Sequence, residues 1–222
     1  MLPQNETIWL PYPIPYCAQV ASPELARAIF VEGMDPALDP RWAETGARDP
    51  QEYAYWTERA CGVACLKMCV EALGGPVRPL LEWARTGVAR GGYRIDQDER
   101  GRPHERGWVH RILAELMVEE GLSASALALD LADFPIHLRA GQMMIASVSF
   151  EVGDDLPVTR KGGHLVVVSG VQVMEGRPTA FWIHNPSGRS SELRAGARIP
   201  ADRFAQGYSG RAILVGPASA RD

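Results

Sequence analysis

The chain has 222 residues, of which 46% are hydrophobic and 23% charged, and its formal net charge at pH 7 is −4. This length supports one sizeable hydrophobic core, so we expect a single domain over residues 1–222. The lack of a basic block argues against a nucleic-acid partner, and the lack of an apolar stretch of roughly 20 residues argues against a membrane partner. No signal-peptide pattern precedes residue 20, so the expected location is the cytoplasm, and no feature indicates an oligomeric state.

The first fifty residues are rich in proline. Residues 11–20 are expected to be extended, since each proline biases its predecessor toward β or polyproline geometry. Residues 22–30 predict a short helix, with Ser22 as N-cap and Pro23 at the first helical position. Residues 33–52 contain three prolines and several charges, and they predict an irregular connection.

A compact apolar run begins at Cys61 and ends at Gly74-Gly75-Pro76, which is a strong helix stop signal. The run predicts a helix with Cys61 at its N-terminal end. A thiol there lies among backbone N–H groups that lack intrahelical partners, and the helix dipole favours its thiolate. Cys61 is therefore the candidate nucleophile.

Metal and disulfide roles for the cysteines are disfavoured by their spacing. Cys61, Cys65 and Cys69 recur every four residues on one helix, so they lie along one face instead of joining distant segments. The three thiols span about 12 Å of helical rise, too far for one tetrahedral zinc. His104 and His110 are six apart, where a zinc-protease helix needs four. We therefore expect no metal.

The middle of the chain continues with helices and one polar segment. Residues 79–85 predict a short helix, and residues 108–120 predict an amphipathic helix. Between them, residues 91–103 form a charged, glycine-punctuated stretch that predicts a long loop, and the region up to residue 106 is a candidate lid.

The second half consists of short β-type runs separated by Gly and Pro turns: residues 143–150, 164–174, 180–184 and 211–215. Helices before strands predict an α+β fold in which a helical part, about residues 20–125, packs on an antiparallel sheet, about residues 140–216. A hairpin turning at Glu175-Gly176 would pair residues whose numbers add to about 351. His164 would then face Ser187, with Asn185 on the same side of the sheet and in contact with the imidazole. His137 and His184 are interpreted as structural.

Cys61, His164 and Asn185 occur in the chain order of a papain-like acyl-transfer site. Together with Pro15-Tyr-Cys-Ala-Gln19, they resemble the papain-like cysteine peptidase family C-thirty-nine, the bacteriocin leader-processing peptidases and their stand-alone relatives. The resemblance implies a papain-like fold, with Cys61 as nucleophile, His164 as base, Asn185 orienting the imidazole and Gln19 lending an amide to the oxyanion hole. Gln19 lies 42 positions before Cys61, farther than in transporter-fused members, so Gln51 is a rival for that role.

The resemblance implies a cysteine-dependent hydrolase of amide or peptide bonds that needs no cofactor and acts on a peptide or small acylated substrate. Two alternatives stay open. An acyltransferase would use the same site but pass the acyl group to an amine, and a silent binding domain would keep the fold without the chemistry.

Overall fold

The computed structural model describes residues 5–154 and 157–218. In these residues, seven strands form one antiparallel sheet in the order β4-β9-β5-β6-β7-β8, and β1 pairs with the C-terminal half of β6. The strands are β1 (Asn5–Trp9), β4 (Leu122–Ala128), β5 (Met143–Val148), β6 (His164–Met174), β7 (Arg177–His184), β8 (Ala197–Pro200) and β9 (Arg211–Pro217).

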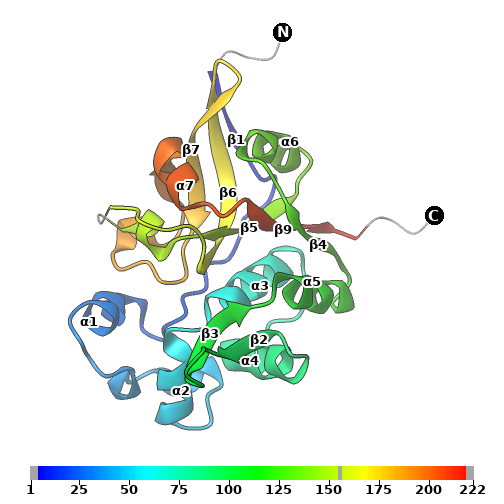
Figure 1. The fold of residues 1–222 in the computed structure, drawn as a ribbon. Helices are drawn as coiled ribbons and strands as arrows, with labels where there is room; N and C mark the ends of the chain where they lie inside the picture. Colours follow the sequence, from blue (N-terminus) through cyan, green and yellow to red (C-terminus); the bar gives the residue numbers. More distant parts are fainter. Residues whose placement is uncertain (1–4, 155–156, 219–222) are drawn as a thin grey trace.

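Helices cover both faces of this sheet (Figure 1). One layer contains α3 (Cys61–Ala72), α4 (Leu80–Ala89) and α5 (His110–Glu119), and the other contains α6 (Phe134–Arg139) and α7 (Ala201–Gly207). The N-terminal part adds α1 (Ala26–Phe30) and α2 (Pro50–Thr57). The α+β class predicted from the sequence is therefore confirmed, with helices packed on an antiparallel sheet.

The period-two pattern of the central strands explains why the sheet has a helical layer on each side. In β5, Met143 and Ile145 join the core formed with α3, α4 and α5, whereas Met144 and Ala146 join the core formed with α6. Because successive side chains of a strand point to opposite faces, an uninterrupted apolar run such as β5 must be covered on both faces.

The β6–β7 hairpin has the turn that the sequence predicts. Its paired residues Met174 and Arg177 next to the turn, and Val167 and His184 near the open end, both have numbers that add to 351. Two register irregularities between these pairs cancel, so the predicted register holds at the end where His164 lies.

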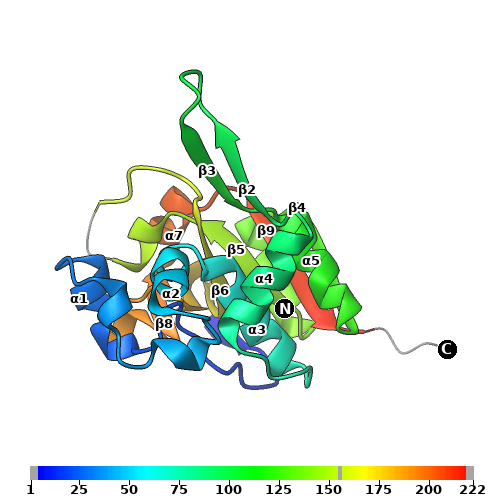
Figure 2. The same cartoon turned by 90° about the horizontal axis from the view of Figure 1, so that it is seen from below.

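Residues 91–106 do not form the predicted loop. Instead β2 (Tyr93–Gln97) and β3 (Pro103–Trp108) pair as a separate two-stranded hairpin, which projects from the body of the molecule (Figure 2). Only the turn between the two strands has the irregular structure that the sequence predicts. There the Asp98 carboxylate accepts hydrogen bonds from the backbone N–H groups of Arg100 and Arg102.

The division into a helical and a sheet part is less strict than expected. β1 and β4 belong to the sheet although they precede residue 140, α6 lies between the two expected parts, and α7 lies within the sheet part. Residues 33–52 contain two 3-10 turns and the start of α2. Among the described residues, no helix is both long enough and apolar enough to span a membrane.

Candidate active site

Cys61 is the first residue of α3, as predicted. Helix α2 ends four residues earlier, and the Arg59 carbonyl in this junction accepts a 2.7 Å hydrogen bond from the Trp108 indole. The Trp108 ring packs so closely on Gly62 that a Cβ there would lie 2.6 Å from it. The glycine after the cysteine therefore lets Trp108 hold the start of α3.

The electrostatics of Cys61 differ from the sequence expectation. Cys61 is half-buried at the edge of a pocket, and desolvation by the neighbouring protein raises the pKa of its thiol to about 11. Backbone N–H groups of Leu165, Gly62 and Cys61 itself oppose the rise but are outweighed by it. The prediction that the helix terminus enriches the thiolate is thus wrong for the free protein, because desolvation exceeds the effect of the helix N-terminus.

His164 is the first residue of β6, and its Nε2 lies 2.8 Å from the Oδ1 of Asn185. The predicted contact between these side chains is confirmed. The Ser187 backbone N–H and hydroxyl each donate to the same Oδ1 at 3.2 Å, which fixes the orientation of the amide. Nε2 must therefore carry the hydrogen that Oδ1 accepts, and the lone pair of the neutral imidazole lies on Nδ1.

Burial keeps this imidazole uncharged. Desolvation lowers the pKa of His164 to about 4, the hydrogen bond with Asn185 opposes the shift, and the positive charge of Arg189 adds to it. At neutral pH the candidate pair therefore consists of a thiol and a neutral imidazole.

Asn185 follows the last residue of β7 and is held by residues that the sequence did not identify. The Tyr16 hydroxyl donates to its backbone carbonyl at 2.8 Å. A Cβ on Gly153, in the 3-10 turn η5 (Phe150–Gly153), would lie 2.3 Å from its Nδ2. Ser187 is the one neighbour of this pair that the sequence indicated, because the predicted strand pairing put it opposite His164. The Ser187 hydroxyl is 3.1 Å from the Nε2 of His164.

Gln19 connects the two halves of the candidate site. Its backbone N–H donates to the Pro186 carbonyl at 2.9 Å, and its side-chain Nε2 donates to the Thr57 carbonyl at 2.6 Å, four residues before Cys61. Its side chain is buried. An amide nitrogen has two hydrogens, so one N–H remains for another acceptor. Gln51, in contrast, is exposed in the first turn of α2.

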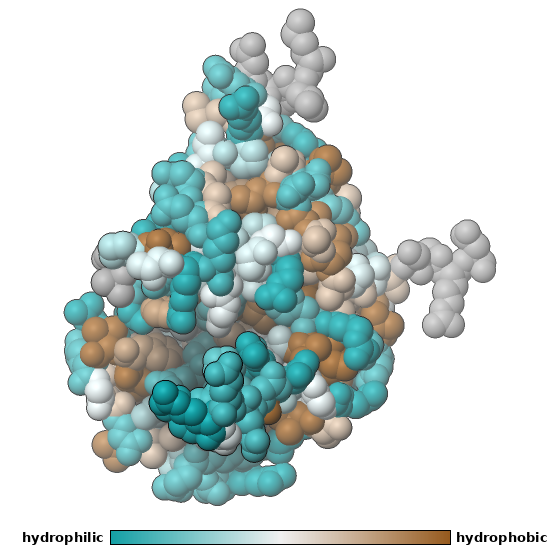
Figure 3. Space-filling view, viewed as in Figure 1, coloured by the Kyte–Doolittle hydropathy of each residue, from teal (hydrophilic) through white to brown (hydrophobic). Residues whose placement is uncertain are grey.

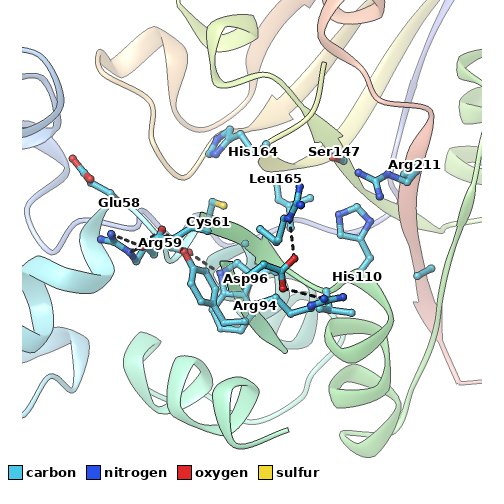
Figure 4. A pocket seen from close by; sticks show the side chains of 18 of the residues that line it. Glu58, Arg59, Cys61, Arg94, Asp96, His110, Ser147, His164, Leu165 and Arg211 are labelled. Atoms are coloured by element: carbon cyan, nitrogen blue, oxygen red, sulfur yellow. Dashed lines mark hydrogen bonds and ion pairs between the residues drawn. The ribbon is translucent and has the colours of Figure 1, made fainter. Parts of the chain in front are cut away.

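A pocket of about 1100 Å³ contains both Cys61 and His164 in its wall. The projecting β2–β3 hairpin forms one side of this pocket through Tyr93, Arg94, Asp96, Glu105 and Arg106. Figure 3 shows the hydrophilic surface of the hairpin, and Figure 4 shows Cys61 and His164 facing the same open space.

The other histidines and cysteines have different surroundings. The two nitrogens of His184 are 3.1 Å from the Ile14 carbonyl and from the Gly196 N–H, and His137 Nδ1 is 2.9 Å from Gln142 Oε1. These contacts agree with structural roles. His104 lies in β3 and His110 begins α5, so they do not share a helix. Within the described residues, no group of three His, Cys, Asp or Glu side chains has a geometry that would hold a metal ion.

Comparison with known proteins gives matches among solved structures only. No model of a known protein family matches the chain, and no curated protein matches it.

The structures that match include peptidase domains of transporters. The peptidase domain of Streptococcus ComA, described as a bifunctional ABC transporter of a quorum-sensing pathway, is 17% identical, with a TM-score of 0.47 over 72% of this chain and 92% of that domain. A double-glycine motif protease from an AMS/PCAT transporter, in complex with the leader peptide, is 17% identical, with a TM-score of 0.44 over 71% of this chain and 84% of its own. The Streptococcus mutans ComA peptidase domain is 17% identical, with a TM-score of 0.39 over 72% of this chain and 93% of its own.

Proposed function

We propose that this protein is a cysteine-dependent hydrolase of amide or peptide bonds that works through a thioester acyl-enzyme. The observation that carries the proposal is the 2.8 Å contact between His164 Nε2 and Asn185 Oδ1, in a histidine that lines the same pocket as Cys61. A base oriented by a third group, beside a nucleophile in a pocket, is the arrangement that nucleophilic catalysis requires.

The reaction starts from the uncharged pair. As the Cys61 sulfur attacks the acyl carbon, the thiol proton moves to Nδ1 of His164, the C–S bond forms and the carbonyl electrons move onto oxygen. When the carbonyl re-forms, the C–N bond breaks and the departing amine takes the proton from the imidazolium. Water then attacks the thioester with His164 as base, which releases the acid and restores the thiol.

Asn185 keeps the imidazole in the reactive tautomer. Its Oδ1 accepts from Nε2–H, and as a neutral amide it does so without titrating. The Ser187 donors on Oδ1 and the close packing of Gly153 on Nδ2 support this role, since both restrict rotation of the amide.

Gln19 is the proposed side-chain donor to the oxyanion. Its burial and its hydrogen bond to Thr57, just before the cysteine, favour it over the exposed Gln51. The second donor would be the backbone N–H of Cys61, at the start of α3 where backbone N–H groups lack helical partners.

The experiment is product analysis in H₂¹⁸O with a pool of synthetic peptides and mass detection. Hydrolysis predicts cleaved peptides whose new carboxylate contains one ¹⁸O atom, in the wild type and not in Cys61→Ala. Products that contain an added amine in place of ¹⁸O would indicate the acyltransferase instead, and equal cleavage by Cys61→Ala would refute the proposal.

A further inference from the structure

The pocket has an excess of positive charge that the proposed chemistry does not use. Of its arginines, Arg59 is paired with Glu105 at 2.7 Å, and Arg94 and Arg106 both pair with Asp96 at 3.0 Å. Within the part of the chain that the structure describes, the two other arginines of the pocket, Arg160 and Arg211, form no ion pair with a carboxylate. The Arg160 guanidinium lies over the Phe150 ring, 4.7 Å from its centroid. Arg211 is therefore available to a charged group from outside the protein.

The surroundings of Arg211 leave its guanidinium accessible. Arg211 is the exposed first residue of β9, paired across the sheet with Ala128 of β4. Ala126 and Ala128 line the pocket beside Arg211, and their side chains are too short to cover its guanidinium. A planar guanidinium with free N–H groups is the side chain best suited to bind a carboxylate through two parallel hydrogen bonds.

Two neutral polar side chains lie near Arg211. His110 begins α5, and burial, followed by the charge of Arg211, lowers the pKa of His110 to about 4, so it is uncharged at neutral pH. Ser147 of β5 pairs across the sheet with Leu165, the residue after His164. Both line the pocket, and both can donate a hydrogen bond to an anion.

This polar group is adjacent to the reactive pair. In Figure 4, Cys61 and His164 lie on one side of Leu165, and Ser147, His110 and Arg211 lie on the other, around one continuous space. The acidic Glu58 that also lines the pocket lies beyond Cys61, away from Arg211. The side of the pocket beyond Leu165 therefore holds Arg211, an arginine without a carboxylate partner, together with two neutral hydrogen-bond donors.

We propose that Arg211, assisted by His110 and Ser147, binds a carboxylate of the substrate while Cys61 attacks a neighbouring acyl carbon. The substrate is then a peptide or acylated amine with a carboxylate near the scissile bond, supplied either by an acidic side chain or by a C-terminus. This inference rests on the proposed function, because it assigns specificity to the same pocket.

The test uses thiol-directed probes in matched pairs, so it does not depend on turnover. N-bromoacetyl-Ala-Gly is compared with its C-terminal amide, and N-bromoacetyl-Glu-amide with N-bromoacetyl-Gln-amide. The rate of Cys61 alkylation is followed by intact mass and peptide mapping in the wild type, Arg211→Gln and Arg106→Gln. Arg106→Gln is the control, because it removes the same charge from the same pocket at an arginine that already has a carboxylate partner.

In the wild type we expect the charged member of at least one pair to react roughly tenfold faster, as a charge-assisted hydrogen bond allows. The ratio should fall to about one in Arg211→Gln and stay high in Arg106→Gln. Preference in the first pair identifies a C-terminal carboxylate, and preference in the second identifies an acidic side chain.

Three outcomes would overturn the inference: ratios near one for both pairs in the wild type, an equal loss of preference in both variants, or labelling of a cysteine other than Cys61. The first two leave the proposed hydrolysis intact, because the peptide-pool experiment measures it independently. Circular dichroism and thermal melting of each variant check that Arg211→Gln is folded.

Discussion

At the scale of single residues, the candidate pair is uncharged before substrate binds, because desolvation moves the two pKa values in opposite directions. The pKa of Cys61 rises to about 11 and that of His164 falls to about 4. The sequence indicated the helix N-terminus, which favours thiolate, but it could not show how strongly neighbouring segments would desolvate the sulfur. The proton must therefore move during attack and not before it.

This arrangement predicts how alkylation of Cys61 depends on pH. With iodoacetamide, the rate at Cys61 should rise about tenfold per pH unit from pH 6 to pH 9, because the thiolate fraction grows at that rate well below the pKa. Cys17, Cys65 and Cys69 should react more slowly, since burial raises the pKa of each of them further. A rate that is already high and constant from pH 5 to pH 8 would instead indicate a preformed thiolate–imidazolium pair.

Gln19 and Gln51 provide a matched comparison for the oxyanion donor. Gln19→Ala should lower turnover by on the order of 10²–10³, the usual effect of one oxyanion donor, and leave alkylation of Cys61 unchanged. Gln51→Ala should have little effect, because its side chain is exposed. The reverse pattern of turnover would transfer the role to Gln51, and unfolding of Gln19→Ala would assign Gln19 to structure.

At the scale of elements, the turn η5 controls the position of Asn185. In Gly153→Ala the new methyl group would lie 2.3 Å from the Asn185 amide nitrogen, so the amide or the turn must shift and the contact with His164 is disturbed. We expect turnover to fall at least tenfold while the chain remains folded. Gly216→Ala is the control, since its Cβ would make an ordinary 3.4 Å contact with Gln142. Equal turnover of the two variants would show that the Gly153 contact does not hold the amide.

The sequence predicts those elements whose signals are local. The helix from Cys61, the strand from His164 and the Glu175-Gly176 turn are confirmed because apolar periodicity and turn residues specify them directly. The β2–β3 hairpin was predicted as a loop, since its charged residues hide the alternation of a strand that is exposed on both sides.

The details of the candidate site depend on contacts between distant segments, which no local pattern records. Gly153 and Tyr16 reach Asn185 from 32 and 169 residues away in the chain, respectively. Arg211 belongs to a strand that the sequence predicted correctly, but only the pairing of β9 with β4 and β5 brings its first residue to the pocket.

At the scale of the whole molecule, burial of neutral histidines predicts loss of stability in mild acid. The pKa of His164 is about 4 in the folded protein and 6.5 ordinarily, so the unfolded chain binds more protons between these values. The free energy of unfolding should therefore fall as the pH drops from 6.5 to 4, by up to roughly 3 kcal/mol from this group. His110 acts in the same direction.

Urea unfolding at a series of pH values measures this dependence. His164→Gln should lose less stability than the wild type between pH 6.5 and pH 4, because it has no imidazole to protonate at that position. Parallel pH curves for the two proteins would show that His164 is not held neutral by the fold.

The identity of the nucleophile is tested most directly by the intact mass of the protein, acid-quenched within seconds of mixing with the peptide pool. We expect a population of wild-type protein whose mass has increased by one acyl fragment, mapped to Cys61. We expect no such population in Cys61→Ala and slower formation in His164→Ala. Peptide cleavage that proceeds without any acyl group on Cys61, or an acyl group mapped to another residue, would show that Cys61 is not the nucleophile.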